Sequence, residues 1–149
     1  MQNNSFEEIK HDGQLIAIIL RADYACDRTR FFSPPGFSQQ LGYIVHKKNG
    51  VIKAHCHKEV QRKITMTQEV LFIKKGRLLA DFYTPHRKYI SSRQLNAGDT
   101  VFLCAGSHGF TMLADTEMIE VKQGPYSGVE GDKELFEGIE NDTSQRTFD

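Results

Sequence analysis

Short runs in which apolar and polar residues alternate recur along the chain, separated by turn-forming residues. The first is the apolar run LIAIIL at 15–20, and the later ones are LGYIVHK (41–47), VIKAHCH (51–57), KITMTQ (63–68), EVLFIKK (69–75), RLLADFYT (77–84), KYISSRQL (88–95), DTVFLC (99–104), HGFTMLA (108–114) and EMIEVKQ (117–123). Alternation with a period of two places successive side chains on opposite faces of a strand. Asn49-Gly50, between two such runs, is typical of a tight hairpin turn. The pattern predicts eight to ten strands and no long helix.

Strands that follow one another without helices between them favour an antiparallel sandwich or barrel. The 149 residues match one globular domain, which we place at 1–140. The stretch 21–40 is aromatic and contains Pro34-Pro35-Gly36, so it predicts a long loop packed on the barrel or on a partner. Residues 141–149 are polar, and we expect a flexible C-terminal tail.

Composition narrows the possible partners and the compartment. Nineteen basic and nineteen acidic residues give a formal charge of zero, so the chain lacks the one-signed field of a nucleic-acid-binding protein. The run LIAIIL is too short to cross a bilayer, and the polar N-terminus does not resemble a secretory signal. Three cysteines form no disulfide framework or metal-finger pattern. We therefore expect a cytoplasmic protein that binds neither nucleic acid nor membranes.

The segment AHCHKEVQRKITMTQEVLFIKKG at 54–76 contains the candidate metal chemistry. On a strand, His55 and His57 point to the same face, within reach of one ion. If the chain turns back between 58 and 68, the carboxylate of Glu69 comes level with the two imidazoles. Such a set is a half-shell for Fe, Mn, Ni, Zn or Cu with open positions. The alternative is that they are ordinary polar residues, since an isolated histidine pair or a carboxylate at a strand end is commonly solvated.

Two motifs resemble those of the cupin superfamily. His55-Cys56-His57, followed by Glu69 and then Gly76, is similar to the first cupin motif, and Gly98, Cys104-Ala105-Gly106 and His108 are similar to the second. The resemblance implies an antiparallel jelly-roll β-barrel or sandwich that holds one metal ion. It also implies that His55, His57, Glu69 and His108 are the ligands.

The spacing from His57 to Glu69 is longer than in the usual motif, which leaves Glu59 and Gln61 as alternatives nearer the expected distance. Glu69 is preferred because EVLFIKKG contains both the apolar strand and the closing glycine. The ending EVKQGPYSGVEGDKELF at 120–136 resembles the last segment of the WbuC-type cupin metalloproteins. That resemblance implies a place in surface-polysaccharide metabolism.

Other residues have weaker assignments. Lys53 shares the expected face of His55, and Tyr43 lies on a neighbouring run, so both are candidate substrate contacts; each is also an ordinary strand residue. Cys56 and Cys104 are candidate thiol ligands or nucleophiles, with structural cysteine as the alternative. An aromatic loop around Phe31, Phe32 and Phe37, together with the apolar side of VLFIKK, predicts a homodimer contact.

Three functions stay open from the sequence. The first is a metal-dependent enzyme of the isomerase, epimerase or dioxygenase type that acts on a sugar, nucleotide sugar or keto acid. The second is a non-catalytic module or sensor that binds a small sugar or metabolite. The third is a metal-free structural cupin. No residue identifies the catalytic group.

Overall fold

A computed structural model describes residues 5–148, which divide into two compact units. Unit 1 is made of the residues up to Tyr24 and those from Gln68 onward, and unit 2 spans Ala25–Thr67. The predicted single domain over 1–140 stays a prediction.

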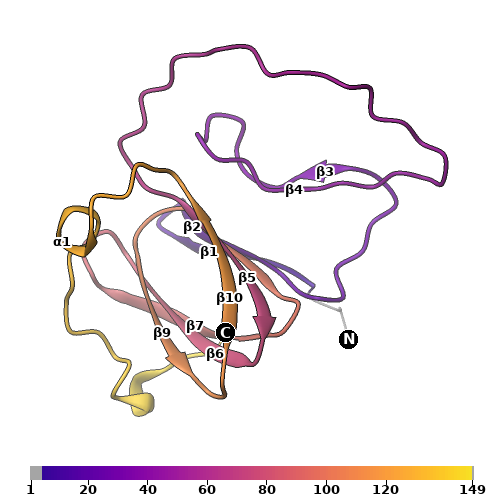
Figure 1. Ribbon diagram of the computed structural model, residues 1–149. Helices are drawn as coiled ribbons and strands as arrows, with labels where there is room; N and C mark the ends of the chain where they lie inside the picture. The colour runs from indigo at the N-terminus through magenta and orange to yellow at the C-terminus, as the bar shows by residue number, and fades with distance from the viewer. Residues whose placement is uncertain (1–4, 149) are drawn as a thin grey trace. The chain divides into compact units, whose positions relative to one another are not determined.

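Unit 1 contains a five-stranded antiparallel sheet, which we call sheet A (Figure 1). Its order is β1-β2-β8-β5-β10, with bounds Phe6–His11 (β1), Gln14–Leu20 (β2), Thr100–Leu103 (β8), Glu69–Lys75 (β5) and Glu117–Lys122 (β10). The apolar run at 15–20 lies inside the sheet because β2 pairs with both β1 and β8. β5 likewise lies between β8 and β10, so β2 and β5 are each paired along both edges.

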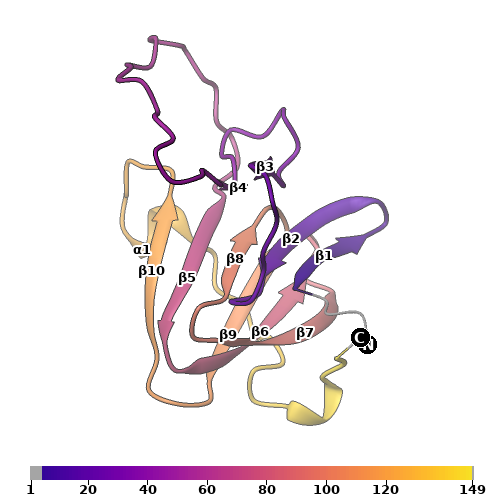
Figure 2. The same cartoon turned by 90° about the vertical axis from the view of Figure 1, so that its right-hand side faces the viewer.

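The second sheet of unit 1, sheet C, has the order β7-β6-β9 and is also antiparallel. Its bounds are Arg77–Tyr83 (β6), Tyr89–Asn96 (β7) and Ser107–Met112 (β9). Gly76 forms the tight turn from β5 to β6 with φ of 82°, a conformation that glycine adopts without strain. This turn carries the chain from one sheet to the other (Figure 2).

The two sheets share one apolar core. Sheet A contributes Ile9, Ile16, Ala17, Ile19, Leu71, Ile73, Val101 and Leu103, and sheet C contributes Leu78, Ala80, Phe82 and Leu95. Apart from Ile16, these residues recur at every second position of their strands, so each sheet has one face in the core. Unit 1 is therefore a sandwich of two antiparallel sheets, which confirms the all-β class. The described residues do not form a closed barrel.

Unit 2 differs most from the predicted strands. It has one short pair, β3 (Arg30–Phe31) with β4 (Gly42–Tyr43), and no other strand among its residues. The predictions of strands over 51–57 and 63–68 are therefore wrong for this structure, and only two residues of 41–47 are extended and paired. Val51 and Ile52 are 80% and 62% exposed, so these apolar side chains lack the partner surface that would stabilise a strand.

The alternation pattern also did not predict strand β1, because its sequence FEEIKH has few apolar positions. Two short helical turns follow β10, α1 (Val129–Asp132) and η1 (Thr143–Gln145). Beyond them Arg146 is buried in unit 1. The predicted flexibility of 141–149 stays a prediction. The sequence did not indicate, however, that Arg146 attaches this segment to unit 1. Within residues 5–148, no helix has the length and apolar character needed to cross a bilayer.

Candidate metal site

Glu69 and His108 come from different sheets and meet inside one end of the sandwich. Glu69 begins β5 on the same side of the strand as the core residues Leu71 and Ile73. His108 shares the inward side of β9 with Phe110, and its ring lies 5.3 Å from that of Phe110. The Nε2 atom of His108 is 3.3 Å from Oε2 of Glu69. Two of the four predicted ligands therefore lie together in unit 1.

The turn before β9 sets the position of His108. Gly106 has φ of 71°, and a Cβ atom built on it would lie 2.2 Å from the carbonyl oxygen of Tyr83. Only glycine fits this close approach in a left-handed conformation. The amides of Cys104 and Ala105 both donate to the carbonyl of Ile16, at 2.8 and 3.2 Å, which fixes the start of the turn on β2.

The environment of Glu69 favours its ionised form. The hydrogen bond with His108 is the largest effect and lowers the pKa of Glu69, while burial opposes it. The positive charges of Lys133 and Lys122 lower the pKa of Glu69 further. At neutral pH the group is thus a carboxylate, which is the form that ligates a metal.

Lys122 lies beside Glu69 and was not singled out from the sequence. It is opposite Glu69 in the β10–β5 register, and its Nζ atom is 3.8 Å from Oε1 of Glu69. The same ammonium group is 3.0 Å from Asp132 and 3.2 Å from Glu120, and these hydrogen bonds raise the pKa of Lys122. Its Nζ atom also lies 5.2 Å from the centre of the Tyr126 ring. The only sign in the sequence was that Glu120 and Lys122 lie two positions apart on the last predicted strand, which places them on the same face.

Gln68 precedes Glu69 and has an unpartnered oxygen. The side chain is 2% exposed, and its Nε2 group donates to the carbonyl of Cys104 at 3.1 Å. Its main-chain amide donates to Oε1 of Gln123 at 2.7 Å. Oε1 of Gln68 has no hydrogen-bond partner in the described structure, so the residue before Glu69 has a buried, unsatisfied acceptor.

His55 and His57 belong to unit 2 and are near each other there. Their ring centres are 5.4 Å apart and the rings are nearly perpendicular. Nδ1 of His55 lies 2.8 Å from the carbonyl oxygen of Lys53. Because a carbonyl only accepts, Nδ1 is the protonated nitrogen, and Nε2 of a neutral ring is left with its lone pair. This is the tautomer that binds a metal through Nε2.

The geometry of this pair suits one ion. A metal-bound imidazole has its ring centre roughly 3 Å from the metal, so two ligands of one tetrahedral ion have centres roughly 5 Å apart. The observed 5.4 Å matches this spacing. Among residues 5–148, no three His, Cys, Asp or Glu side chains come together as a metal site. The predicted ligand set takes His55 and His57 from unit 2 and Glu69 and His108 from unit 1, and it stays a prediction.

The weaker candidates also lie in unit 2. Lys53 is exposed, and its main-chain carbonyl accepts the hydrogen bond of His55. Tyr43 is half-buried and pairs with Arg30 in the β3–β4 ladder. Glu59 and Gln61, the alternatives to Glu69, are exposed. Their role as substrate contacts or ligands stays a prediction.

The thiol of Cys104 is poorly suited to ligation or nucleophilic attack. The residue is fully buried, and burial raises the pKa of its thiol to about 12. The reactive and metal-binding form is the thiolate, which such a pKa disfavours. This supports the structural interpretation of Cys104.

Comparisons of the chain with protein-family models, with curated proteins and with solved structures find no match.

Proposed function

We propose that the chain is a cupin-type metalloprotein that binds one divalent transition metal through His55, His57, Glu69 and His108. The observation that carries the proposal is the contact of His108 with Glu69, 3.3 Å apart. The two residues were selected from separate motifs, and the sandwich brings them together at one end of its interior.

The chemistry of the donors supports the same proposal. Glu69 is ionised, since its pKa is lowered by His108, and His55 has Nε2 available. Three imidazoles and one carboxylate suit Fe, Mn, Ni or Zn and leave positions for a further ligand. When bound, the metal would polarise an oxygen of a small molecule.

We propose an oxygen-rich small molecule as the ligand of this site: a sugar, a nucleotide sugar or a keto acid. Such molecules offer neighbouring oxygens to a metal. Lys53 and Tyr43 would contact the same molecule through an ammonium and a hydroxyl group. If the chain is an enzyme, we propose an isomerase, epimerase or dioxygenase activity in surface-polysaccharide metabolism. We expect the chain to form a homodimer.

A second candidate is a non-catalytic module that binds the same class of molecule. The ion pairs around Glu69 favour it. Lys122 already pairs with Glu69, Glu120 and Asp132. The pKa of Lys122 is raised and that of Glu69 is lowered, so both groups keep their charge near neutral pH and suit ligand binding better than proton transfer.

Metal content of the purified full-length chain tests the proposal. We expect about one transition metal per chain, a marked loss in His55→Ala and His108→Ala, and unchanged occupancy in His86→Ala. His86 is the matched control because it is exposed in the turn between β6 and β7. Full occupancy in both of the first two variants contradicts the assignment.

Turnover of metal-loaded protein with sugars, nucleotide sugars and keto acids then separates the two candidates. Product formation that disappears in His108→Ala supports the enzyme. Saturable binding without product supports the module.

A further inference from the structure

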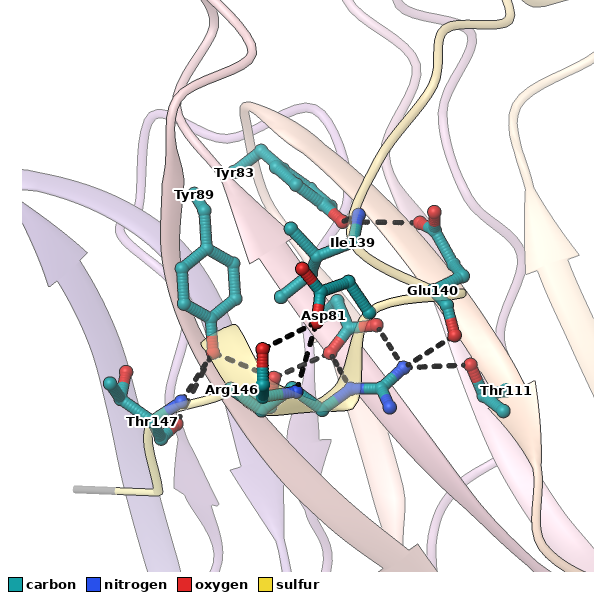
Figure 3. A network of polar contacts seen from close by, with 11 residues as sticks. Asp81, Tyr83, Tyr89, Thr111, Ile139, Glu140, Arg146 and Thr147 are labelled. Carbon is teal, nitrogen blue, oxygen red and sulfur yellow. Dashed lines mark hydrogen bonds and ion pairs between the residues drawn. The ribbon is translucent and has the colours of Figure 1, made fainter.

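The outer face of sheet C is polar and is covered by the end of the chain. On β6, Leu78, Ala80 and Phe82 face the core, so Asp81 and Tyr83 face the other way. Ser92 of β7 is paired with Asp81 in the sheet register. Figure 3 shows residues 139–147 lying over these side chains. We call residues 137–148 the C-terminal strap.

A buried ion pair attaches the strap to β6. Nε of Arg146 is 3.0 Å from Oδ1 of Asp81, and Nη2 is 3.0 Å from Oδ2. Ser92 donates its hydroxyl to the same carboxylate. Nη2 of Arg146 also donates to the Thr111 hydroxyl at 2.9 Å. The Arg146 and Asp81 side chains are 1% and 0% exposed, so the sheet provides a fitted receptor for a guanidinium group.

The main chain of the strap makes three further hydrogen bonds, one of them with the main chain of β7. The Ser92 amide of β7 donates to the carbonyl of Thr147 at 2.9 Å. The Thr147 amide donates to the Tyr89 hydroxyl at 2.8 Å, and the Ile139 amide donates to the Tyr83 hydroxyl at 3.0 Å. Main-chain bonds of this kind accept many sequences, whereas the Arg146 receptor selects one side chain.

The polarity of this contact indicates a cover that can leave. A permanently covered face is served at least as well by apolar residues, because replacing a buried ion pair by apolar groups is commonly neutral or stabilising. A face of Asp81, Ser92 and two tyrosines stays hydrated when it is uncovered. Local opening of such a terminal segment requires less free energy than unfolding of the sandwich.

One atom of the resident arginine is left unsatisfied. Nη1 of Arg146 is buried and has no hydrogen-bond partner in the described structure. A buried guanidinium N–H without an acceptor weakens binding. A segment that brings its own acceptor to this position would bind the receptor more tightly than the strap does.

We propose that the outer face of sheet C is a binding site for an extended, arginine-containing peptide segment of a partner protein, and that the C-terminal strap occupies it until displaced. The arginine of the partner would take the place of Arg146 on Asp81. Its main chain would replace Thr147 at the Ser92 amide. This site is separate from the proposed metal ligands.

Binding of a synthetic peptide to the full-length chain tests the proposal. The probe is the fluorescently labelled peptide FEGIENDTSQRTF, residues 136–148, compared with the same peptide carrying lysine at the arginine position. We expect Arg146→Ala to bind the arginine peptide about tenfold more tightly than the wild type, whose strap competes. The lysine peptide should bind at least about tenfold more weakly, because an ammonium group cannot make the bidentate contact. Equal binding of both peptides, or binding of neither, overturns the proposal.

Hydrogen exchange of the wild-type chain tests the release directly and does not depend on the folding of a variant. We expect the Thr147 amide to exchange much faster than the Ala80 and Phe110 amides in the β6–β9 ladder. An excess of the arginine peptide should speed the exchange of Thr147 and leave Ser92 protected. Exchange of Thr147 only with global unfolding would show a permanent cover and overturn the proposal.

Discussion

His108 of β9 and Glu69 of β5 contact each other between the two sheets of the sandwich, with Nε2 3.3 Å from Oε2. A glycine in a left-handed conformation precedes each of two strands near this contact: Gly106 precedes β9, and Gly98 precedes β8, which pairs with β5. The two residues thus unite the separate motifs found in the sequence.

Glu69→Gln should reduce stability more at neutral pH than in acid. The folded-state pKa of Glu69 is lowered from its ordinary value of 4.5. Its ionised form therefore stabilises the fold above the unfolded-state pKa, and this contribution is lost as the pH falls through the folded-state pKa. In the presence of a chelator, urea denaturation should show a loss of about 2 kcal/mol at pH 7 and a smaller loss at a pH below the folded-state pKa. An equal loss at both pH values would contradict the assigned charge state.

Gly106→Ala should strongly destabilise unit 1, since the new Cβ atom would lie 2.2 Å from the Tyr83 carbonyl oxygen. We expect a loss of about 3 kcal/mol or more in chemical denaturation. Gly13→Ala is the matched control, because Gly13 has a similar φ of 78° but no atom within 4 Å of the added carbon. Its loss should be only about 1 kcal/mol. Similar losses in both variants would show that the close approach at Gly106 is not required.

The three thiols should differ in reactivity. Cys56 is exposed and Cys26 is partly exposed, whereas Cys104 is buried with a pKa of about 12. In the native chain, a thiol reagent at pH 8 should label Cys26 and Cys56 rapidly, and Cys104 only after denaturation. Mass spectrometry of the labelled peptides measures this directly. Rapid native labelling of Cys104 would restore it as a candidate nucleophile.

An apolar patch on the outer face of sheet A should form a homodimer contact. Phe72 pairs with Ile119 across β5 and β10, and the two side chains are 41% and 53% exposed. Val70 and Val121 form the next outward pair of the same register. Sedimentation should give twice the chain mass for the wild type and one chain mass for Ile119→Glu.

Met112→Glu is the matched control for the dimer, since Met112 is 48% exposed and lies on the other sheet. It should remain a dimer. A wild-type chain that sediments at a single chain mass at micromolar concentration would contradict the prediction.

The sandwich strands could be predicted from sequence because their alternation matches the burial that the two sheets impose. The run 69–75 coincides with β5 in full, and 77–84 differs from β6 by one residue. The FEEIKH strand could not be predicted in this way because it lacks alternating apolar residues. Its Glu7 pairs with Arg93 and its Lys10 pairs with Glu8, so polar side chains make contacts along this edge strand.

At 51–57 and 63–68 the alternation predicted strands that the structure does not contain. A period of two identifies residues that suit a strand, but a strand also requires a partner. Val51, Ile64 and Met66 remain exposed without one. The alternation of residues within one segment does not show whether another strand will pair with it.

Only part of the candidate site was accessible from sequence. The cupin-like motifs selected Glu69 and His108, which the structure brings together. Lys122 was missed because its importance depends on the register of β10 with β5. The pairing of Arg146 with Asp81 was missed as well, since 65 positions separate the two residues and neither belongs to a motif.

Anomalous scattering from crystals of the metal-loaded, full-length chain tests the central claim most directly. The account predicts one strong peak, about 2.0–2.2 Å from nitrogen atoms of His55, His57 and His108 and from a carboxylate oxygen of Glu69. Two results would contradict the account in crystals grown with the same metal. One is the absence of an anomalous peak at Glu69 and His108. The other is a peak there that neither His55 nor His57 contacts.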